Sequence, residues 1–396
     1  MRVCMVVDRF HPLIGGVEQQ TLQLSKALID CNVQVMVLTR RVNQSLPAFE
    51  ELEGVGVYRV PPGGRRSHWL NLISVPIFVY ALLRHRRRFD VLHVHDMFAL
   101  FLAAVIFHWL TRKPFIVKVP THGNVERRAS KTTHTSLYSW LLHRVILPDF
   151  FWRLLLKQPA SYIAISQEIA DELSASGLAD KIVRIPNAVD VSRFRPLDHQ
   201  ERTALRARLG FDLNDFVIVS HGRIVARKRL DVLIDAVSRL ASTHRGIRLV
   251  LPGPFYPPDP ALKDSLNSMV QTSKLSDVII FTGATDEPEM FLRAADCFVL
   301  PSEREGMPNA LLEAMACKLP VIASEIGGVT DVLRHTENGF MFAIGDVNAL
   351  VDLLNMCIRD ADKTLALANE AHRTIQQDYI WSVISQKYKT LYANLV

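Results

Sequence analysis

The chain alternates short runs of β-branched and other apolar residues with longer stretches whose apolar residues recur at helical spacing. Arg2–Val7 is such a short run, and the loop 8–16 separates it from a stretch that places Val17, Thr21, Leu24 and Leu28 on one helical face. Further strands of the first half are expected at Val33–Leu38, Asp90–His95, Phe115–Val119 and Tyr162–Ile165. This repeating order is typical of βαβ units and a parallel sheet.

A second series of the same kind follows a break in the pattern. Around 185–196 turn residues and two prolines interrupt it, and a polar stretch continues to Asp215. Strands are then expected at Phe216–Ser220, Ile247–Leu251, Val278–Phe281, Cys297–Pro301 and Pro320–Ser324. We therefore predict an α/β protein with two Rossmann-like, doubly wound domains, 1–190 and 191–375, facing a central cleft. A final helix, patterned over Ile375–Leu395 and assigned to 376–396, is expected to cross back to the first domain. Ligands of such sheets bind at the carboxyl ends of the strands, so the cleft is the expected site.

Composition supports two ordinary packed cores. The 396 residues are 49% hydrophobic, which excludes a small disulfide-stapled scaffold and a disordered chain. The five cysteines are widely spaced and form no CxxC pair, so we expect a reducing, cytoplasmic setting without a disulfide framework or zinc ribbon. The apolar run Met1–Val7 is too short for a signal peptide. Trp69–Leu83 and Phe98–Leu110 are both shorter than the ~20 apolar residues that a membrane-spanning helix needs.

The most informative stretch, 297–324, reads CFVLPSEREGMPNALLEAMACKLPVIAS. It predicts a strand, a loop, and a helix that begins near Pro308, a residue suited to the first helical turn. Gly306 lacks a Cβ and lets a ligand approach the backbone. The amides near Asn309 and Ala310, at the helix N-terminus, suit a pyrophosphate.

Two glutamates flank that helix start. Glu305 precedes the helix, where a sugar attached to the phosphate would lie, and Glu313 follows eight positions later, within reach of a ribose diol. The alternative is that Glu305 caps the helix and Glu313 is a solvated surface residue, because two glutamates at this spacing also occur by chance.

The stretch 220–230, SHGRIVARKRL, follows a predicted strand directly. Arg223 and Lys228 lie five positions apart, where a guanidinium and an ammonium suit a diphosphate leaving group. Arg227 and Arg229 are interpreted as a solvated basic cluster instead.

Two further loops follow first-domain strands. Gly15 and Gly16 permit a tight turn and a close approach to phosphate, although a plain βα turn explains them equally well. His122 lies in the loop after Phe115–Val119, and a lone histidine of this kind is usually structural. No metal-ligand cluster is visible, and the Asp-x-Asp pair at 360–362 lies far along the chain from the proposed site, so we expect chemistry without a metal or cofactor.

Several segments in a fixed order carry a family resemblance. They are GGVE, DVLHVHD, THG, IPNAVD, GRIVARK, FTGATDEPEMFLRAADCFVLPSEREGMPNALLEAMA, PVIASEIGGVTDVL and NGF. Together they cover essentially the whole chain, which resembles the retaining nucleotide-sugar glycosyltransferases of GT-B architecture, family four (glycosyl transferases group 1). The resemblance implies a hexosyltransferase that uses a nucleotide diphosphate sugar, with a UDP-sugar expected.

The resemblance also implies a role for each matching residue. Glu305 would contact the donor sugar, Glu313 the ribose, and Arg223 and Lys228 the pyrophosphate, with His122 near the reacting sugar. The other donor-binding positions it implies are Gly15, Gly16, Gly283, Ala284, Gly306, Met307, Pro308, Asn309 and Ala310. Retention is expected to proceed by front-face attack, with the leaving phosphate taking the acceptor proton. The protein would then stabilise the departing diphosphate electrostatically.

One position departs from the family pattern behind the predicted helix. Lys318 stands where the motif ACGxPV commonly has glycine. Because this position lies behind the helix, we expect little effect on activity.

Basic charge is concentrated in one segment. The formal net charge is +6, yet Arg65 to Lys157 alone holds 15 Lys/Arg against 4 Asp/Glu. Within it, Tyr138–Lys157 mixes aromatic, aliphatic and basic residues, which fits peripheral binding to an anionic membrane surface. No nucleic-acid-binding module is visible. The expected partners are thus a nucleotide-sugar donor and a lipid-linked or glycan acceptor, and an acidic polysaccharide or lipid diphosphate is compatible.

Two alternatives of other classes stay open at this point. A nucleotide-sugar epimerase has a similar two-domain fold, but it needs acid/base groups around the sugar and no acceptor. A catalytically dead scaffold is the other alternative, against which the intact Glu305, Glu313, Arg223 and Lys228 argue.

Overall fold

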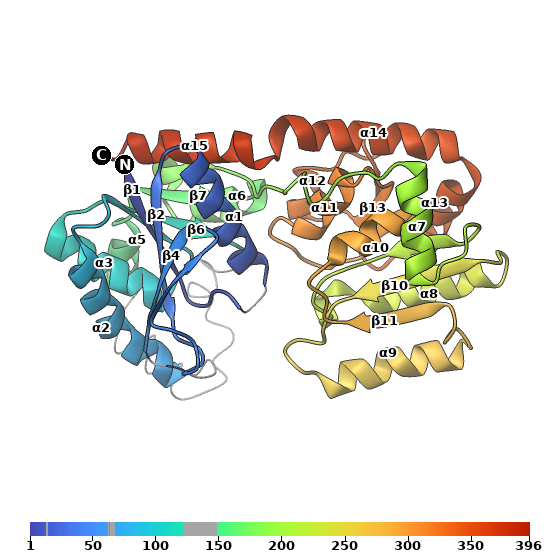
Figure 1. Cartoon of the computed structure of the whole chain (residues 1–396), viewed down its shortest axis with the longest axis horizontal. Coiled ribbons are helices and arrows are strands. Elements are labelled where there is room, and N and C mark those ends of the chain that lie inside the picture. The colour runs from blue at the N-terminus through green and yellow to red at the C-terminus, as the bar shows by residue number, and fades with distance from the viewer. Residues whose placement is uncertain (13–14, 62, 64–67, 122–148) are drawn as a thin grey trace. The chain divides into compact units, whose positions relative to one another are not determined.

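The computed structural model describes residues 1–12, 15–61, 63, 68–121 and 149–396 and divides the chain into two compact units (Figure 1). The N-terminal unit spans Met1–Asn187 and Trp381–Val396, and the C-terminal unit spans Ala188–Ile380. Each unit contains one sheet with helices packed around it. The predicted pair of doubly wound α/β domains is confirmed.

The N-terminal sheet has the strand order β3-β4-β2-β1-β5-β6-β7-β8. Its strands are β1 (Arg2–Val7), β2 (Gln34–Arg40), β3 (Phe49–Leu52), β4 (Val55–Val60), β5 (Val91–Val94), β6 (Phe115–Val119), β7 (Ser161–Ala164) and β8 (Ile182–Arg184). β3 pairs antiparallel with β4, and the other pairs are parallel. Strand order reverses between β1 and β5, which is the switch point of this sheet.

The helices of the N-terminal unit bury their apolar faces against this sheet and one another. They are α1 (Gly16–Asp30), α2 (His68–His85), α3 (Ala99–Thr111), α5 (Asp149–Leu156), α6 (Gln167–Ala175) and α15 (Trp381–Ala393). α1 buries Thr21, Leu24 and Leu28, as its spacing predicts, and it packs on α15. In the part of the chain that the structure describes, no helix has the length and apolar character needed to cross a bilayer.

The C-terminal sheet is entirely parallel, with the order β11-β10-β9-β12-β13-β14. Its strands are β9 (Phe216–Val219), β10 (Ile247–Pro252), β11 (Ile279–Gly283), β12 (Cys297–Leu300), β13 (Val321–Ser324) and β14 (Phe340–Phe342). After β11 the chain returns to the other side of β9, so the switch point lies between β9 and β12. The site described below lies at the carboxyl ends of these two strands.

The helices of the C-terminal unit are α7 (His199–Leu209), α8 (Leu230–Ala241), α9 (Pro260–Thr272), α10 (Pro288–Ala294), α11 (Asn309–Ala316), α12 (Gly327–Thr330), α13 (Val347–Arg359) and α14 (Ala361–Asp378). α8 shows how they join the core, since it packs on α13 and buries Leu233 and Val237 together with Leu350 of that helix. Such burial contributes roughly 2 kcal/mol per large aliphatic side chain.

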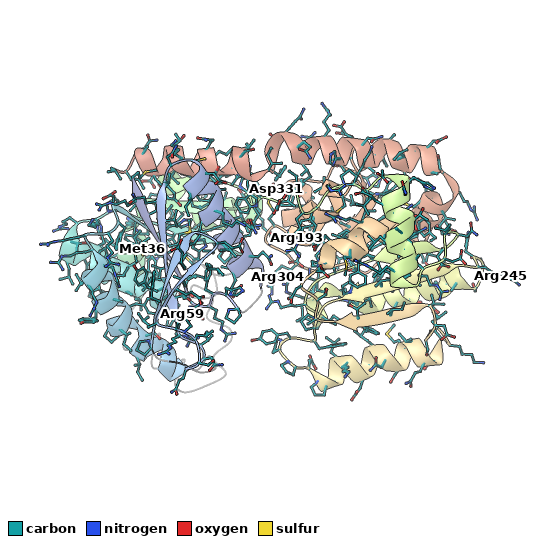
Figure 2. All side chains as sticks on the ribbon, in the orientation of Figure 1. Met36, Arg59, Arg193, Arg245, Arg304 and Asp331 are labelled. Carbon is teal, nitrogen blue, oxygen red and sulfur yellow. The ribbon has the colours of Figure 1, made fainter. Side chains whose placement is uncertain are left out.

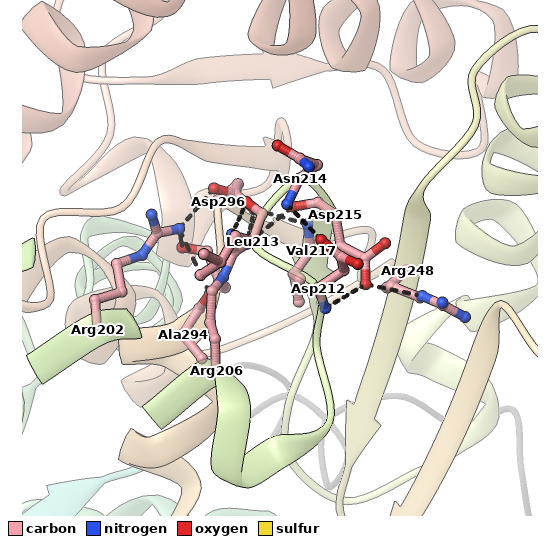
Figure 3. Close-up of polar contacts among 11 residues, drawn as sticks. Arg202, Arg206, Asp212, Leu213, Asn214, Asp215, Val217, Arg248, Ala294 and Asp296 are labelled. Carbon is pink, nitrogen blue, oxygen red and sulfur yellow. Dashed lines mark hydrogen bonds and ion pairs between the residues drawn. The ribbon is translucent and has the colours of Figure 1, made fainter. Parts of the chain in front are cut away.

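A polar network holds the amino ends of β9 and β12 together (Figure 3). Asp296, just before β12, accepts a hydrogen bond from Val217 N (2.8 Å) and pairs with Arg202 (2.6 Å) and with Arg206 of α7. Arg206 is buried, and its guanidinium also donates to three backbone carbonyls, of Leu213, Asp215 and Ala294. Each of the three guanidinium nitrogens of Arg206 therefore has a protein acceptor.

Most sequence-predicted strands are present within two residues of their expected ends, and Arg2–Val7 and Phe115–Val119 match fully. The strands that the pattern missed are β3, β4, β8 and β14. β3 and β4 form a hairpin against the sheet edge, and β8 and β14 have three residues each, too few for a period to be detected.

The prediction of one helix over Ile375–Leu395 is wrong. The structure has α14 and α15, separated at Tyr379 and Ile380. Val189 N donates to Tyr379 O (2.8 Å), and Val189 forms a bridge with Ile380. The backbone leaves the helical conformation here because it pairs with the segment around Val189.

Candidate functional site

The loops after β9 and β12 meet at the switch point of the C-terminal sheet. The first runs from Ser220 to Arg229 and includes a single 3₁₀ turn at Ala226–Lys228, and the second precedes α11. Glu303 N donates to Arg227 O (2.8 Å), so the two loops are joined through their backbones. This join brings basic side chains of one loop to acidic side chains of the other.

Glu305 is the centre of this arrangement. Its carboxylate lies 2.7 Å from Lys228 Nζ and 2.8 Å from Arg227 Nη1, and it accepts a hydrogen bond from Ser302 Oγ (3.1 Å). Burial by itself raises the pKa of Glu305, but the charges and hydrogen bonds of Lys228 and Arg227 outweigh burial and hold that pKa at about 2. Glu305 is therefore an ionised hydrogen-bond acceptor throughout the neutral range, rather than a helix cap.

The interpretation of Arg227 as a solvated residue is wrong. Besides its ion pair with Glu305, Arg227 Nη1 donates to the carbonyl of Arg304 (2.7 Å), a residue labelled in Figure 2. A strand-end loop that carries several cations gives no sign of which one turns towards the neighbouring loop, so sequence reasoning missed it. Arg229 pairs with Asp231 (2.9 Å), outside this cluster.

Arg223 and Lys228 differ in how many partners they have. Lys228 is mostly buried and uses Glu305 as its ion-pair partner. Arg223 is exposed, and no described residue forms an ion pair or hydrogen bond with it. A guanidinium with all its donors available can take an incoming anion without first breaking a protein contact.

α11 begins at Asn309, beside Glu305, with Pro308 as its cap residue in an extended conformation. No side chain caps this end, which has the positive end of the helix dipole. Glu313 lies one turn further along, where its Oε2 is 2.8 Å from His221 Nε2 of the β9 loop. Glu313 is mostly buried, so the alternative that it is a solvated surface residue does not hold.

Gly328 contacts the backbone of the loop between β12 and α11. It belongs to α12, after β13, and a Cβ built there would lie 1.8 Å from the carbonyl oxygen of Gly306. Only glycine allows this approach. The sequence shows this position only as the second glycine of the motif IGGVTD, and the motif by itself does not indicate which backbone the glycine contacts.

The other residues predicted from the sequence fall into three groups. Gly283 ends β11 with a φ of +75°, and Ala284 follows it, at the edge of the same sheet. Gly15 and Gly16 lie at the start of α1 in the N-terminal unit. The remaining donor positions, Gly306, Met307 and Ala310, are buried beside Glu305 at the start of α11. His122 lies outside the described residues.

The motif DVLHVHD contributes a buried cluster to the N-terminal unit. His93 Nδ1 lies 2.7 Å from Tyr392 Oη of α15, and the rings of His93 and His95 stack at 4.3 Å. Lys118 Nζ lies 5.8 Å from the ring centre of Tyr388. Burial lowers the pKa of Lys118 to about 7, and burial followed by the charge of Lys118 lowers the pKa of His95 to about 3.

Among the described residues, no group of three or more His, Cys, Asp or Glu side chains has the arrangement of a metal site. All five cysteines are free thiols.

Two family models match the chain. "Glycosyltransferase Family 4" matches residues 14–193 and "Glycosyl transferases group 1" matches residues 201–374. The chain is 23% identical over 405 residues to a glycosyltransferase of Methanocaldococcus jannaschii, covering 99% of this chain and 98% of the relative. It is 25% identical over 390 residues to UDP-Gal:alpha-D-GlcNAc-diphosphoundecaprenol alpha-1,3-galactosyltransferase of Escherichia coli, covering 97% of this chain and 95% of the relative.

The fold has close counterparts among solved structures. Sucrose-phosphate synthase of Thermosynechococcus elongatus superimposes with a TM-score of 0.81 at 21% identity, covering 100% of this chain and 98% of that chain. These matches give no support to an epimerase. The chain belongs to the group 1, family 4 glycosyltransferases and is a glycosyltransferase with the GT-B fold.

Proposed function

We propose that this glycosyltransferase moves a hexose-type sugar from a UDP-sugar to a lipid-linked or glycan acceptor at a membrane surface, with retention of configuration and without a metal. The observation that carries the proposal is the pairing of Lys228 and Arg227 with Glu305 at the switch point, beside the uncapped start of α11. The Escherichia coli relative, whose name states a UDP-sugar donor and a diphosphoundecaprenol-linked acceptor, supports the donor and acceptor classes.

The donor diphosphate fits the cationic side of this site. Lys228 has three N–H donors and uses Glu305 as its ion-pair partner, and the exposed fork of Arg223 is available. The start of α11 adds backbone N–H groups and the positive end of a dipole. The ionised Glu305 accepts hydrogen bonds from hydroxyls of the donor sugar, and Glu313 accepts them from the ribose.

The proposed transfer step uses these groups as follows. The bond between the sugar's anomeric carbon and the diphosphate oxygen breaks, and the acceptor hydroxyl oxygen bonds to the same face of that carbon. The hydroxyl proton passes to the departing diphosphate, so the products are UDP and the glycosylated acceptor. Glu305 is a poor nucleophile because two cations hold its carboxylate, which favours front-face attack over a covalent intermediate. The protein's contribution is stabilisation of negative charge on the leaving group.

A product analysis tests the proposal. Purified enzyme would be incubated with UDP-hexoses and a lipid-diphosphate-linked acceptor, in buffer with and without EDTA, and the anomeric configuration of the product read by NMR. We expect transfer that survives EDTA and keeps the donor's configuration. An inverted product would overturn retention, and loss of transfer in EDTA would overturn metal independence.

An apolar surface with basic residues supports action at a membrane. On α5, the side chains of Phe150 and Phe151 are 74% and 54% exposed. The ring of Trp152 packs edge-on against that of Phe101 of α3, with 5.3 Å between the ring centres. α3 exposes Trp109 and Leu110 in turn, and Trp109 Nε1 donates to Gln158 Oε1 (2.9 Å), just beyond α5. The exposed cations beside these residues are Arg112, Arg153 and Lys157. Such a mixture favours the interface of an anionic bilayer.

Vesicle flotation tests the membrane contact. The double variant Phe150→Ser/Phe151→Ser should lose most flotation with vesicles that contain anionic lipid, because it removes two exposed anchors. Leu365→Ser, at a position 52% exposed on α14 of the other unit, is the matched control and should float like the wild type. Equal flotation of all three proteins would show that α5 is not the membrane contact.

A further inference from the structure

His221 packs against the core of the C-terminal unit and contacts Glu313 of the candidate site. It follows β9 by two residues, and its ring meets that of Phe298 of β12 at 60° and 6.0 Å between ring centres. Phe298 is fully buried. The imidazole therefore has a rigid apolar support, and its Nε2 is 2.8 Å from Glu313 Oε2.

A second cation, Arg193, interacts with Glu313 through its charge but forms its ion pair with another carboxylate. Arg193 pairs with Glu289 (2.7 Å). Burial opposes the charge of Arg193, but the hydrogen bond and charge of Glu289, with a further contribution from Glu313, raise the pKa of Arg193 overall. Within the described ranges, His221 is the side chain at ion-pair distance from Glu313. No described residue donates a hydrogen bond to Glu313 Oε1, so this oxygen is available to a ligand.

The two glutamates of the site are thus fixed by different chemistry. Glu305 pairs with two cations that also suit a diphosphate, whereas Glu313 lies at ion-pair distance from an imidazole that packs against the core. An imidazole that contacts one oxygen orients the carboxylate without covering both oxygens. A vicinal diol needs this arrangement, because its two hydroxyls donate to adjacent acceptor sites.

We infer that His221 is a positioning residue that holds the Glu313 carboxylate ready for the ribose diol of the donor nucleotide. This inference rests on the proposed function. Preorganisation of this kind lowers the entropy cost of binding. Because the ribose takes no part in bond making or breaking, the benefit is equal in the ground state and the transition state, and it affects KM rather than kcat.

Steady-state kinetics provide the first test. His221→Ala should raise the KM for the donor about 10-fold while kcat stays within about twofold of the wild type. His221→Gln should recover most of the loss, because its terminal amide nitrogen reaches about the position of Nε2 and keeps a polar contact with Glu313, whereas the shorter His221→Asn should not. His199→Ala, at an exposed histidine of α7, is the matched control. A loss in kcat with an unchanged KM, or equal behaviour of the Ala and Gln variants, would overturn the inference.

Calorimetric binding provides a readout that a merely structural role would not move. UDP and its 2′,3′-dideoxy analogue would be titrated into the wild type and His221→Ala. Removing the diol should weaken binding to the wild type about 10-fold and binding to the variant much less, because the variant has already lost that contact. The same loss in both proteins would overturn the inference and leave the proposed function standing. A wild type that binds no nucleoside diphosphate would overturn both.

Discussion

The two ends of β9 and β12 carry polar clusters of similar composition and different completeness. At the amino ends, Asp296 pairs with Arg202 and Arg206, and the fork of Arg206 is occupied by carbonyls as well as by the carboxylate. At the carboxyl ends, Glu305 pairs with Lys228 and Arg227. In the first cluster every nitrogen of the buried Arg206 guanidinium has a protein acceptor, whereas beside the second cluster the guanidinium of Arg223 has none among the described residues.

The difference lies in the unused donors. Arg223 is exposed and has no ion pair or hydrogen bond within the described chain, Lys228 has three N–H groups, and α11 starts without a side-chain cap. Ion pairs by themselves do not separate a structural cluster from a binding site, because both ends have them. What separates them is that the buried guanidinium of Arg206 has an acceptor at each nitrogen, whereas that of Arg223 is exposed, has no acceptor among the described residues, and fits a ligand that supplies one.

The largest effect is expected at the carboxyl ends. Lys228→Ala and Arg223→Ala should each lower turnover ~100-fold or more, the loss seen when one preorganised donor to a developing negative charge is removed. Thermal unfolding should change little for Arg223→Ala, whereas Lys228→Ala also removes one of the two cations that pair with the buried Glu305 and should lower the unfolding temperature, so turnover is compared per folded molecule. Arg245→Ala is the control, because Arg245 is exposed near the amino end of β10, and it should keep wild-type turnover (Figure 2). Near-normal turnover in both Lys228→Ala and Arg223→Ala would mean that the cluster at the carboxyl ends of β9 and β12 is structural, like the cluster at their amino ends.

The opposite result is expected at the amino ends. Asp296→Ala leaves the buried Arg206 without its carboxylate and should lower the free energy of unfolding by about 3 kcal/mol, measured by urea denaturation. Turnover per folded molecule should stay at the wild-type level. Asp235→Ala breaks an exposed pair with Arg239 on α8 and should cost less than about 0.5 kcal/mol. An Asp296→Ala protein with normal stability and reduced turnover would contradict the structural role of this cluster.

Sequence alone predicted the frame of this site but not its contacts. Strand ends at β9 and β12, the helix start near Pro308, and the neighbourhood of Glu305 and Lys228 follow from local periodicity and from the rule that ligands meet strand carboxyl ends. Arg227 and His221 contact Arg304 and Glu313, which lie more than 70 residues further along the chain. Gly328 and the residue it contacts, Gly306, belong to the segments that follow two neighbouring strands, β13 and β12. No local pattern encodes which of several adjacent cations turns inward, because packing between loops decides it. The same holds for the break at Tyr379, which depends on Val189.

A buried cation in the N-terminal unit, which forms no ion pair with a described residue, tests whether such a charge must indicate function. Lys118 is buried on β6, and burial lowers its pKa to about 7 from 10.5. Between these values the unfolded chain holds a proton that the folded chain has released, so stability rises with pH across this window and the full cost applies below pH 7. Lys118→Met should therefore stabilise the protein by a few kcal/mol at pH 7 and below, with the gain shrinking towards pH 10.

Differential scanning calorimetry from pH 6.5 to 10 would measure that gain. Lys113→Met is the control, because Lys113 is only partly buried and lies just before the same strand. A gain for Lys118→Met that did not change with pH would mean that the methionine stabilises by packing alone. Burial of the Lys118 charge would then have no measurable cost in stability, and the argument from unused donors would apply to the C-terminal unit alone.

The smallest effect is expected at the far end of α11. Lys318 follows this helix with a φ of +62°, and its N–H donates to Met315 O (3.0 Å) while Leu319 N donates to Ala314 O (3.1 Å). This is a Schellman ending, in which glycine avoids the strain of the left-handed conformation. Lys318→Gly should raise the free energy of unfolding by ~0.5–1 kcal/mol, and Lys318→Ala, which keeps a Cβ there, should not. Turnover should be unchanged in both, because only the N-terminal end of α11 lies at Glu305. A change in donor KM would mean that the two ends of this helix are not independent.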